Sequence, residues 1–164
     1  MKRIAVLVLI LACVGGLYAH PHFRKEVTAD LEGAKATITY RTTPSNEAHI
    51  GNVAVGSFVT PRGPSLNLSA DVMAGSTKIA AGDYTIGVVR KADKDWAIAL
   101  FPGRLGRGQT PSASELIELD SMFSANDGNA EHMLLDITPG HGKFEGRAVL
   151  TLKFGSLTCA GALS

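Results

Sequence analysis

The amino-acid sequence predicts an all-β protein, an antiparallel β-sandwich of jelly-roll-like type that follows an N-terminal signal peptide. Three observations lead to this fold class. Apolar and polar residues alternate with a period of two in short segments from about Val27 onward, as in strands with one buried face. Clusters of Gly, Asp, Asn and Pro separate these segments. Strands do not alternate with helices, which favours antiparallel over parallel sheets.

Length and charge limit the functions that the chain can have. The 164 residues suffice for one domain and a targeting segment. The 16 Lys and Arg residues nearly balance the 15 Asp and Glu residues, so no nucleic-acid partner is expected. Glycine is frequent, with 18 residues, and only 19% of the residues are charged, a composition that suits strands and turns.

Residues 1–19 have the layout of a secretory signal peptide. A basic start at Met1–Arg3 precedes an apolar run from Ile4 to Val14, and Leu17–Ala19 ends in a small residue. The apolar run is shorter than the roughly 20 residues that a membrane-spanning helix needs. We therefore expect cleavage after Ala19 and export to the periplasm or to the exterior of a bacterium.

An alternative processing site lies at Cys13. Ile10–Cys13 has a small residue before the cysteine, as lipoprotein signals do, and cleavage there would leave a lipid-anchored Cys13. Contact with a membrane is expected only in that case. Cys159 is the other cysteine, so a chain cut after Ala19 keeps one thiol and forms no internal disulfide.

The chain after the signal divides into two parts. Residues 20–34 are expected to form an N-terminal extension with the first strand, and residues 35–164 the sandwich domain. Five segments of the domain alternate clearly, and every second residue along each is predicted to face the core. These residues are Ala36, Ile38, Tyr40, Tyr84, Ile86, Val88, Trp96, Ile98, Leu100, Met133, Leu135, Ile137, Ala148, Leu150, Leu152 and Phe154.

Turns and two short helices are predicted between the strands. The turns are expected at Ala81–Asp83, Lys91–Lys94, Asn126–Asn129 and Pro139–Gly142, where Gly, Asn, Asp and Pro gather. Ser112–Glu115 has the spacing of a capping box, which predicts a short helix there. A second short helix is predicted within residues 45–56.

Two of the predicted strands resemble the signature of a known family. Ala81–Ile86 reads "AGDYTI" and Lys94–Ile98 reads "KDWAI". This pair resembles the Ala-Gly-x-Tyr-Thr and Asp-x-Trp strands of the bacterial envelope family DUF2911, a domain of unknown function. Looser matches follow at Glu131–Ile137 and Leu150–Phe154, so the resemblance covers roughly Lys35 to the C-terminus. It implies an exported β-sandwich and no known activity.

The chain departs from that family in one segment. Many members carry a Trp-Arg-x-Gly-Ala-Asn stretch before the signature, whereas this chain has "SNEAHIGNVAVG" at residues 45–56. A ligand pocket built on that Trp and Arg is therefore not carried over to this chain.

The stretch "HPH" at residues 20–22 is the strongest candidate for a metal site. In an extended segment, His20 and His22 share one face, with backbones about 7 Å apart. Pro21 favours that extended form. After cleavage behind Ala19, the free amine and ring of His20 together with the ring of His22 would form a nitrogen site that suits copper, with zinc as the alternative.

Two further histidines are candidates to complete this metal site. His49 and His132 are the ones we expect as a third ligand. Glu47 and His49 would share a face on a strand but point about 200° apart on a helix, and the sequence leaves both readings open. The competing interpretation is that His20 and His22 form a solvated terminal segment without a metal.

Other catalytic templates are missing from the sequence, and no catalytic or cofactor-binding residue is assigned. There is no Gly-x-Ser-x-Gly elbow. Cys159 stands in an apolar alternating run and is interpreted as a small buried residue rather than a nucleophile. Gly103–Gln109 lacks the Lys-Ser/Thr pair of a phosphate loop, so a plain connecting loop is favoured over one that meets anions or glycans.

Three functional hypotheses follow. The first is an exported, non-enzymatic protein with a binding or structural role, whose partner is a small molecule, a glycan or an envelope protein. The second is a copper- or zinc-binding protein that uses His20 and His22. The third is a hydrolase or oxidase that acts on envelope or extracellular polymers, with such a copper site as one possible means. The sequence further predicts that Trp96, the only tryptophan, is largely buried.

Overall fold

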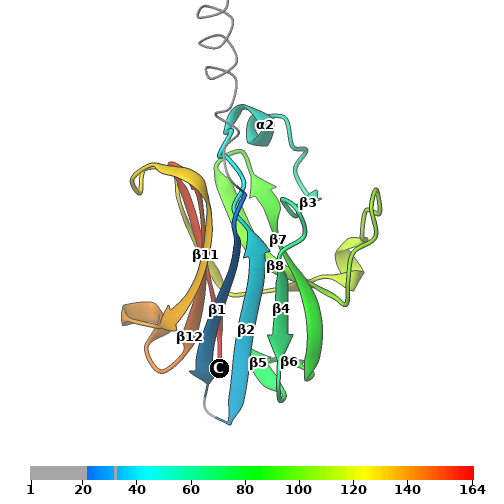
Figure 1. The fold of residues 1–164 in the computed structure, drawn as a ribbon, viewed down its shortest axis with the longest axis vertical. Helices are drawn as coiled ribbons and strands as arrows, with labels where there is room; N and C mark the ends of the chain where they lie inside the picture. Colours follow the sequence, from blue (N-terminus) through cyan, green and yellow to red (C-terminus); the bar gives the residue numbers. More distant parts are fainter. Residues whose placement is uncertain (1–21, 32) are drawn as a thin grey trace, which may run out of the picture.

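The protein is an antiparallel β-sandwich, as the sequence predicts (Figure 1). The structure is a computed structural model that describes residues 22–31 and 33–164. The expected signal peptide, Cys13 and His20 lie outside the described residues. Two sheets face each other with the hydrophobic core between them. No helix among the described residues is long and apolar enough to cross a membrane.

The larger sheet has seven antiparallel strands. Its order is β1-β2-β4-β7-β8-β9, and β3 also pairs with β7. The bounds are β1 Arg24–Leu31, β2 Ala34–Arg41, β3 Phe58–Val59, β4 Ser65–Leu68, β7 Gly82–Ala92, β8 Asp95–Pro102 and β9 Ile117–Glu118. The predicted Lys91–Lys94 turn therefore joins the neighbouring strands β7 and β8 into a hairpin.

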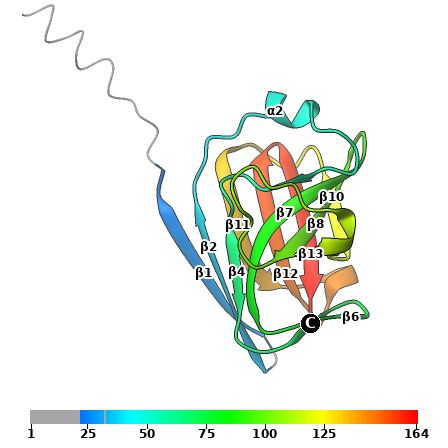
Figure 2. The same cartoon turned by 90° about the vertical axis from the view of Figure 1, so that its right-hand side faces the viewer.

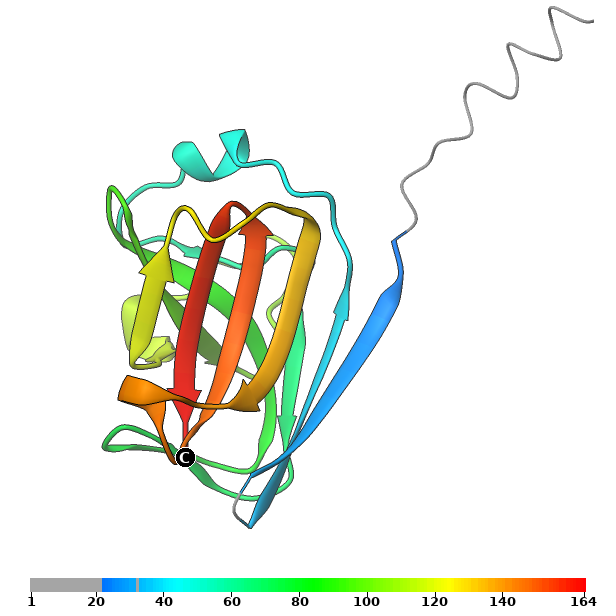
Figure 3. The same cartoon turned by 90° about the vertical axis from the view of Figure 1, so that its left-hand side faces the viewer.

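The smaller sheet has four strands and faces the viewer in Figure 3. Its order is β10-β13-β12-β11. The bounds are β10 Ser121–Ser124, β11 Ala130–Pro139, β12 Ala148–Gly155 and β13 Leu157–Leu163. Strands β11, β12 and β13 follow one another as hairpins while β10 pairs with β13, which is a Greek-key arrangement of the kind found in most sandwiches.

The helices among the described residues are all short. They are α2 Ala48–Gly51 and two 3-10 turns, η1 Ala113–Glu115 and η2 Gly142–Phe144. The capping box predicted at Ser112 is present, because the backbone N–H of Ser112 donates to Glu115 Oε2 at 2.7 Å. The second predicted helix is α2. Glu47 is the N-cap residue of α2 and has helical backbone angles, so Glu47 and His49 do not share a strand face.

The predicted core faces are confirmed. Side chains on the facing surfaces of both sheets have no exposure to solvent, among them Ile38, Ile98, Met133 and Leu150. Trp96 is 7% exposed, which confirms its predicted burial. Val88 and Ala148 are only partly buried. Burial alternates along β2 and β11, but β7 and β8 are buried on both faces, since Val89 and Ala99 on their other face are at most 4% exposed. One-sided burial therefore accounts for β2 and β11 but not for the β7–β8 hairpin.

Residues 20–34 contain β1, which belongs to the larger sheet. Strand β1 pairs with β2 along its whole length, from Arg24 opposite Arg41 to Leu31 opposite Ala34. The pairing continues beyond the strand, since the backbone N–H of Thr42 donates to the Phe23 carbonyl at 2.9 Å. Strand β1 also lies beside β11 of the smaller sheet (Figure 1).

The two ends of the sandwich are built differently (Figure 2). At one end, here called the closed end, the hairpin of β5 Val72–Ala74 and β6 Thr77–Ile79 lies next to the C-terminus. Met73 and Ser164 exchange backbone hydrogen bonds there. At the other end, here called the open end, residues 45–57 with α2 cross over the space between the sheets.

Candidate functional site: an apolar cavity under residues 45–57

A cavity of about 320 Å³ lies between the two sheets at the open end. Strand β8 of the larger sheet and strands β10, β12 and β13 of the smaller sheet supply its inner wall. The side chains on this wall are Trp96, Phe123, Leu152, Phe154, Leu157 and Cys159. All of them are apolar or weakly polar, so the interior offers dispersion contacts rather than hydrogen bonds.

Cys159 lies in the inner wall of the cavity, and its thiol is not reactive at neutral pH. It is 3% exposed, and its Sγ donates to the Trp96 carbonyl at 3.3 Å. Burial raises the pKa of the Cys159 thiol from its usual 9.0 to about 12. The thiolate is the nucleophilic form of cysteine, so a thiol that stays protonated at neutral pH fits the small buried residue predicted from the sequence.

The mouth of the cavity carries a few polar side chains. Asn46 and His49 come from residues 45–57, and Thr43 and Arg62 come from segments that follow β2 and β3. Asn46 Nδ2 lies 3.4 Å from His49 Nε2, and Arg62 Nε donates to Thr43 Oγ1 at 3.4 Å. An apolar interior with a small number of polar groups at its opening is typical of small-molecule sites.

Residues 45–57 form a lid over this cavity, and side chains hold the lid in place. None of the α2 residues is buried, although Ile50 and Val53 pack against the core. Glu47 Oε1 accepts a hydrogen bond from the backbone N–H of Ser156, in the turn between β12 and β13, at 2.5 Å. A segment with few buried contacts opens at low free-energy cost, so the lid is the part of the site suited to admit a ligand.

Arg90 holds the other side of the lid. Its guanidinium donates to the carbonyls of Gly51, at 3.2 Å, and Val53. The same group pairs with Asp93 Oδ1 at 2.8 Å and lies 5.9 Å from the centre of the Trp96 ring. One side chain that is 13% exposed therefore connects the lid, the β7–β8 turn and the cavity wall.

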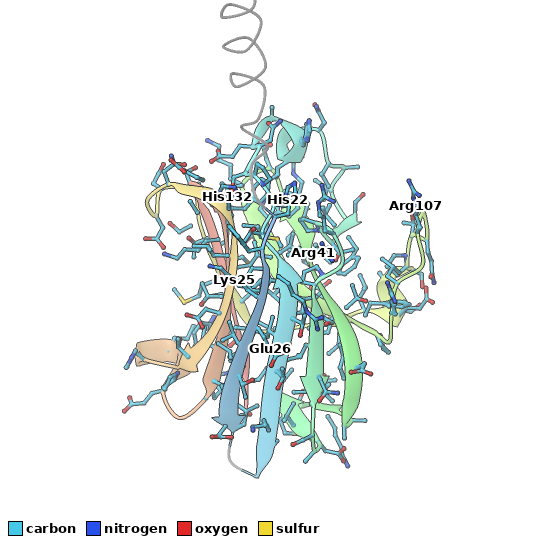
Figure 4. The ribbon with its side chains drawn as sticks, viewed as in Figure 1. His22, Lys25, Glu26, Arg41, Arg107 and His132 are labelled. Atoms are coloured by element: carbon cyan, nitrogen blue, oxygen red, sulfur yellow. The ribbon has the colours of Figure 1, made fainter. Side chains whose placement is uncertain are left out.

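The candidate metal ligands are spread over different parts of this end of the molecule. His22 precedes β1, His132 lies in β11 opposite Pro44, and His49 lies in α2 at the cavity mouth. Figure 4 places His22 and His132 toward the end that carries α2. No group of three or more His, Cys, Asp or Glu side chains within residues 22–31 and 33–164 could hold a metal ion.

His22 has one ring nitrogen fixed by the fold. Its Nδ1 donates to the Thr42 carbonyl at 2.8 Å, so Nδ1 carries the proton and Nε2 is the nitrogen that can accept a ligand. The Nε2 atom of His132, in contrast, is buried. His20, the other half of the predicted pair, lies outside the described residues.

Several residues of the site were not identified from the sequence. Arg90 faces Trp96 across the β7–β8 hairpin, a pairing that follows once the Lys91–Lys94 turn is placed. Phe123 lies in β10, a strand of four residues that is too short to give a clear alternation. The cavity itself has no local sequence signal, because its wall combines residues more than 60 positions apart.

Comparison with known proteins adds no relative. No protein-family model, no curated protein and no solved structure matches the chain. The resemblance to DUF2911 therefore stays a prediction from the sequence, and what the site does has to be argued from its own geometry.

Proposed function

We propose that the chain is a non-enzymatic binding protein that holds a small apolar molecule in the cavity under residues 45–57. The observation that carries this proposal is the cavity of about 320 Å³ between the sheets, with aromatic walls and a polar mouth. Its volume falls at the small end of the range of about 300–1,000 Å³ that is typical of ligand pockets. Its apolar lining offers water few hydrogen-bond partners, so an apolar ligand could displace water from it at little cost.

The side chains at the cavity support binding rather than catalysis. Its titratable lining consists of His49, Arg62 and Cys159, without a carboxylate. Covalent catalysis needs a nucleophile activated by a neighbouring base. The Cys159 thiol donates its hydrogen bond to the Trp96 carbonyl rather than to a base, and burial raises its pKa to about 12.

The proposal sets this binding outside the cytoplasm. The basic and apolar layout of residues 1–19 supports export, with a lipid anchor at Cys13 as the alternative. The resemblance to an envelope family supports the same setting. Among the partners expected from the sequence, a small molecule is preferred over a glycan or an envelope protein, because the cavity lies between the two sheets and its lining is apolar.

The test uses the neutral apolar dye N-phenyl-1-naphthylamine and the single tryptophan. Trp96 lines the cavity, so excitation of its indole should transfer energy to dye bound there. Val88 also lines the cavity, and Val88→Phe should fill it and weaken dye binding by about tenfold or more. Leu157→Phe, which fills the same space from the opposite sheet, should have the same effect.

The matched control is Leu134→Phe. Leu134 is 37% exposed on the outward face of β11, so a larger ring there should leave the dye affinity unchanged. Thermal melting checks that all three variants fold. Equal dye affinity in the folded filling variants and the control would reject the cavity as a binding site.

Copper binding by His20 and His22 is a second candidate function, supported by one contact. Metal-binding histidines commonly donate their second ring N–H to a backbone carbonyl. The bond from His22 Nδ1 to the Thr42 carbonyl, at 2.8 Å, has this form and directs ligand binding to Nε2. This proposal also requires cleavage after Ala19, which would free the amine of His20.

Copper titration of three proteins tests the second candidate. The first starts at His20, the second carries one Gly before His20, and the third starts at His20 with His22→Ala. The first should bind one copper ion more tightly than the other two, since a preceding residue removes the free amine. Equal copper affinities would mean that the histidine pair binds no metal, and zinc added in the same way shows whether copper is preferred.

A further inference from the structure

A second hollow, of about 470 Å³, lies on the outward face of the larger sheet. Outward-facing residues of β2, β4 and β7 form its floor, including Thr39, Ser65 and Asp83. Its rim carries four arginines from separate parts of the chain, Arg24, Arg41, Arg62 and Arg104. We call this hollow the arginine groove. These four are half of the eight arginines in a chain whose formal net charge is only +1.

None of these four arginines has a carboxylate partner among the residues that the structure describes. Within residues 22–31 and 33–164, none of them forms an ion pair, whereas Arg90 and Arg147 pair with Asp93 and Asp120. Asp83 is the one acidic residue among the described residues that line the groove, and its Oδ1 accepts a hydrogen bond from Asn67 Nδ2 at 2.8 Å. The groove therefore gathers like charges that its own side chains do not neutralise, and a bound anion would relieve their repulsion.

Arg62 adds an independent sign of function. It is the only described residue other than glycine with a positive φ, at 57°, and Gly63 follows with a φ of 55°. Side chains with a Cβ are strained in this region, and such strain is concentrated at sites where it serves a function. The turn sets Arg62 where its side chain lines both the arginine groove and the mouth of the apolar cavity.

The charge of the groove indicates what it would bind. Guanidinium groups bind phosphate through two parallel hydrogen bonds. Four arginines and one aspartate give the lining a net charge of +3. One carboxylate would neutralise only part of this charge, while two phosphate monoesters carry about −3 to −4 at neutral pH. We propose that the arginine groove binds two or more phosphate groups at once.

This proposal does not rest on the apolar ligand of the cavity. The phosphate groups that the arginine groove binds can come from two kinds of molecule. The phosphates belong either to a soluble molecule or to lipid headgroups on a membrane surface. The soluble probe is inorganic pyrophosphate, followed by calorimetry at low ionic strength, because such contacts are screened by salt. The membrane probe is sedimentation with vesicles of phosphatidic acid, compared with vesicles of phosphatidylcholine.

The test variant is Arg41→Gln with Arg104→Gln. Both side chains are exposed, so the double variant should fold with an unchanged melting temperature. It should bind pyrophosphate about tenfold more weakly or worse, and it should lose any vesicle binding. The control is Arg107→Gln, which removes one positive charge from the loop that carries Arg104 but none from the groove, and it is compared with Arg104→Gln alone as well as with the double variant; Figure 4 shows Arg107 well away from Arg41.

Arg62→Asn distinguishes the role of the Arg62 side chain in phosphate binding from any effect of the turn on the stability of the fold. Asn adopts a positive φ more readily than Arg, so this variant should melt no lower than the native chain and still bind pyrophosphate more weakly. Binding to phosphatidic acid vesicles but not to pyrophosphate would assign the phosphates to a lipid headgroup. Binding of neither probe, or equal weakening by Arg107→Gln and the double variant, would overturn the proposal.

Discussion

The same two sheets form both the closed and the open end of the sandwich, but their side chains pack differently at the two ends. At the closed end, Leu68, Ile79 and Leu163 are at most 2% exposed, and backbone hydrogen bonds between Met73 and Ser164 fasten the β5–β6 hairpin. At the open end, a cavity of about 320 Å³ remains, and side chains such as Glu47 and Arg90 hold the lid of residues 45–57 in place. Dense packing at the closed end thus stabilises the fold, whereas the open end is less densely packed and contains a cavity.

The largest expected effect compares one leucine from each end. Leu68→Ala should lower the free energy of unfolding by about 2–5 kcal/mol, because it empties a filled part of the core. Leu157→Ala should lose less than about 2 kcal/mol, since Leu157 is only partly buried and already borders the cavity. Urea unfolding measures both. Equal losses would mean that the two ends are packed alike.

Alkaline pH should weaken the open end through Cys159. Burial raises the pKa of this thiol to about 12, against 9.0 for an ordinary cysteine. Above pH 9 the unfolded chain releases the thiol proton first, so the free energy of unfolding should fall between pH 9 and 12 and be unaffected below pH 9. The expected loss near pH 10 is about 1 kcal/mol.

The control for this pH effect is Cys159→Ala, because tyrosines and lysines titrate in the same range. The difference in unfolding free energy between the native chain and Cys159→Ala should shrink as the pH rises from 9 to 11. A constant difference would show that the thiol is open to solvent through the cavity, and that the open end is not closed by its lid.

Loosening the lid should have a smaller effect. Glu47→Gln replaces a charged acceptor of the Ser156 N–H by a neutral one and should cost about 1 kcal/mol of lid closure. Release of N-phenyl-1-naphthylamine in stopped-flow experiments should then become about fivefold faster. Glu145→Gln, on the exposed turn after η2, is the control and should leave the release rate unchanged.

The smallest effect is expected for a surface ion pair. Lys91 Nζ lies 2.7 Å from Glu118 Oε2, with side chains 43% and 38% exposed. Glu118→Gln should change the free energy of unfolding by less than about 1 kcal/mol, because solvent and salt screen exposed pairs. Chemical denaturation measures it, and a larger loss would mean that exposed charges contribute to the sandwich on the same scale as its packing.

The fold could be predicted from the sequence where burial is one-sided and strands are long. The alternation around Ile38 and Met133 indicated the core faces, because the pleat sends every second side chain inward. Strands of two to four residues, such as β3 and β10, carry too few positions for a pattern. The β3 pairing also depends on Gly87, since a Cβ there would lie 2.4 Å from the Phe58 ring.

The sites could be predicted less well, because they join distant segments. Arg104 belongs to the loop for which the sequence analysis considered anion binding, yet Arg24, Arg41 and Arg62 join it only through the order of the strands. The apolar cavity gave no signal, since wall residues look like ordinary core residues in sequence. His22 was identified from its spacing, but its bond to Thr42 follows from the pairing of β1 with β2.

Strand β1 has a consequence for how copies of this chain meet one another. It forms one border of the larger sheet, where unsatisfied backbone groups could template a strand of another molecule. Four of its eight residues, Arg24, Lys25, Glu26 and Asp30, are charged and exposed. The opposite border, β9, is only two residues long. Both borders of the larger sheet are thus poor templates for a further strand, which disfavours aggregation of these molecules through edge-to-edge strand pairing at high concentration.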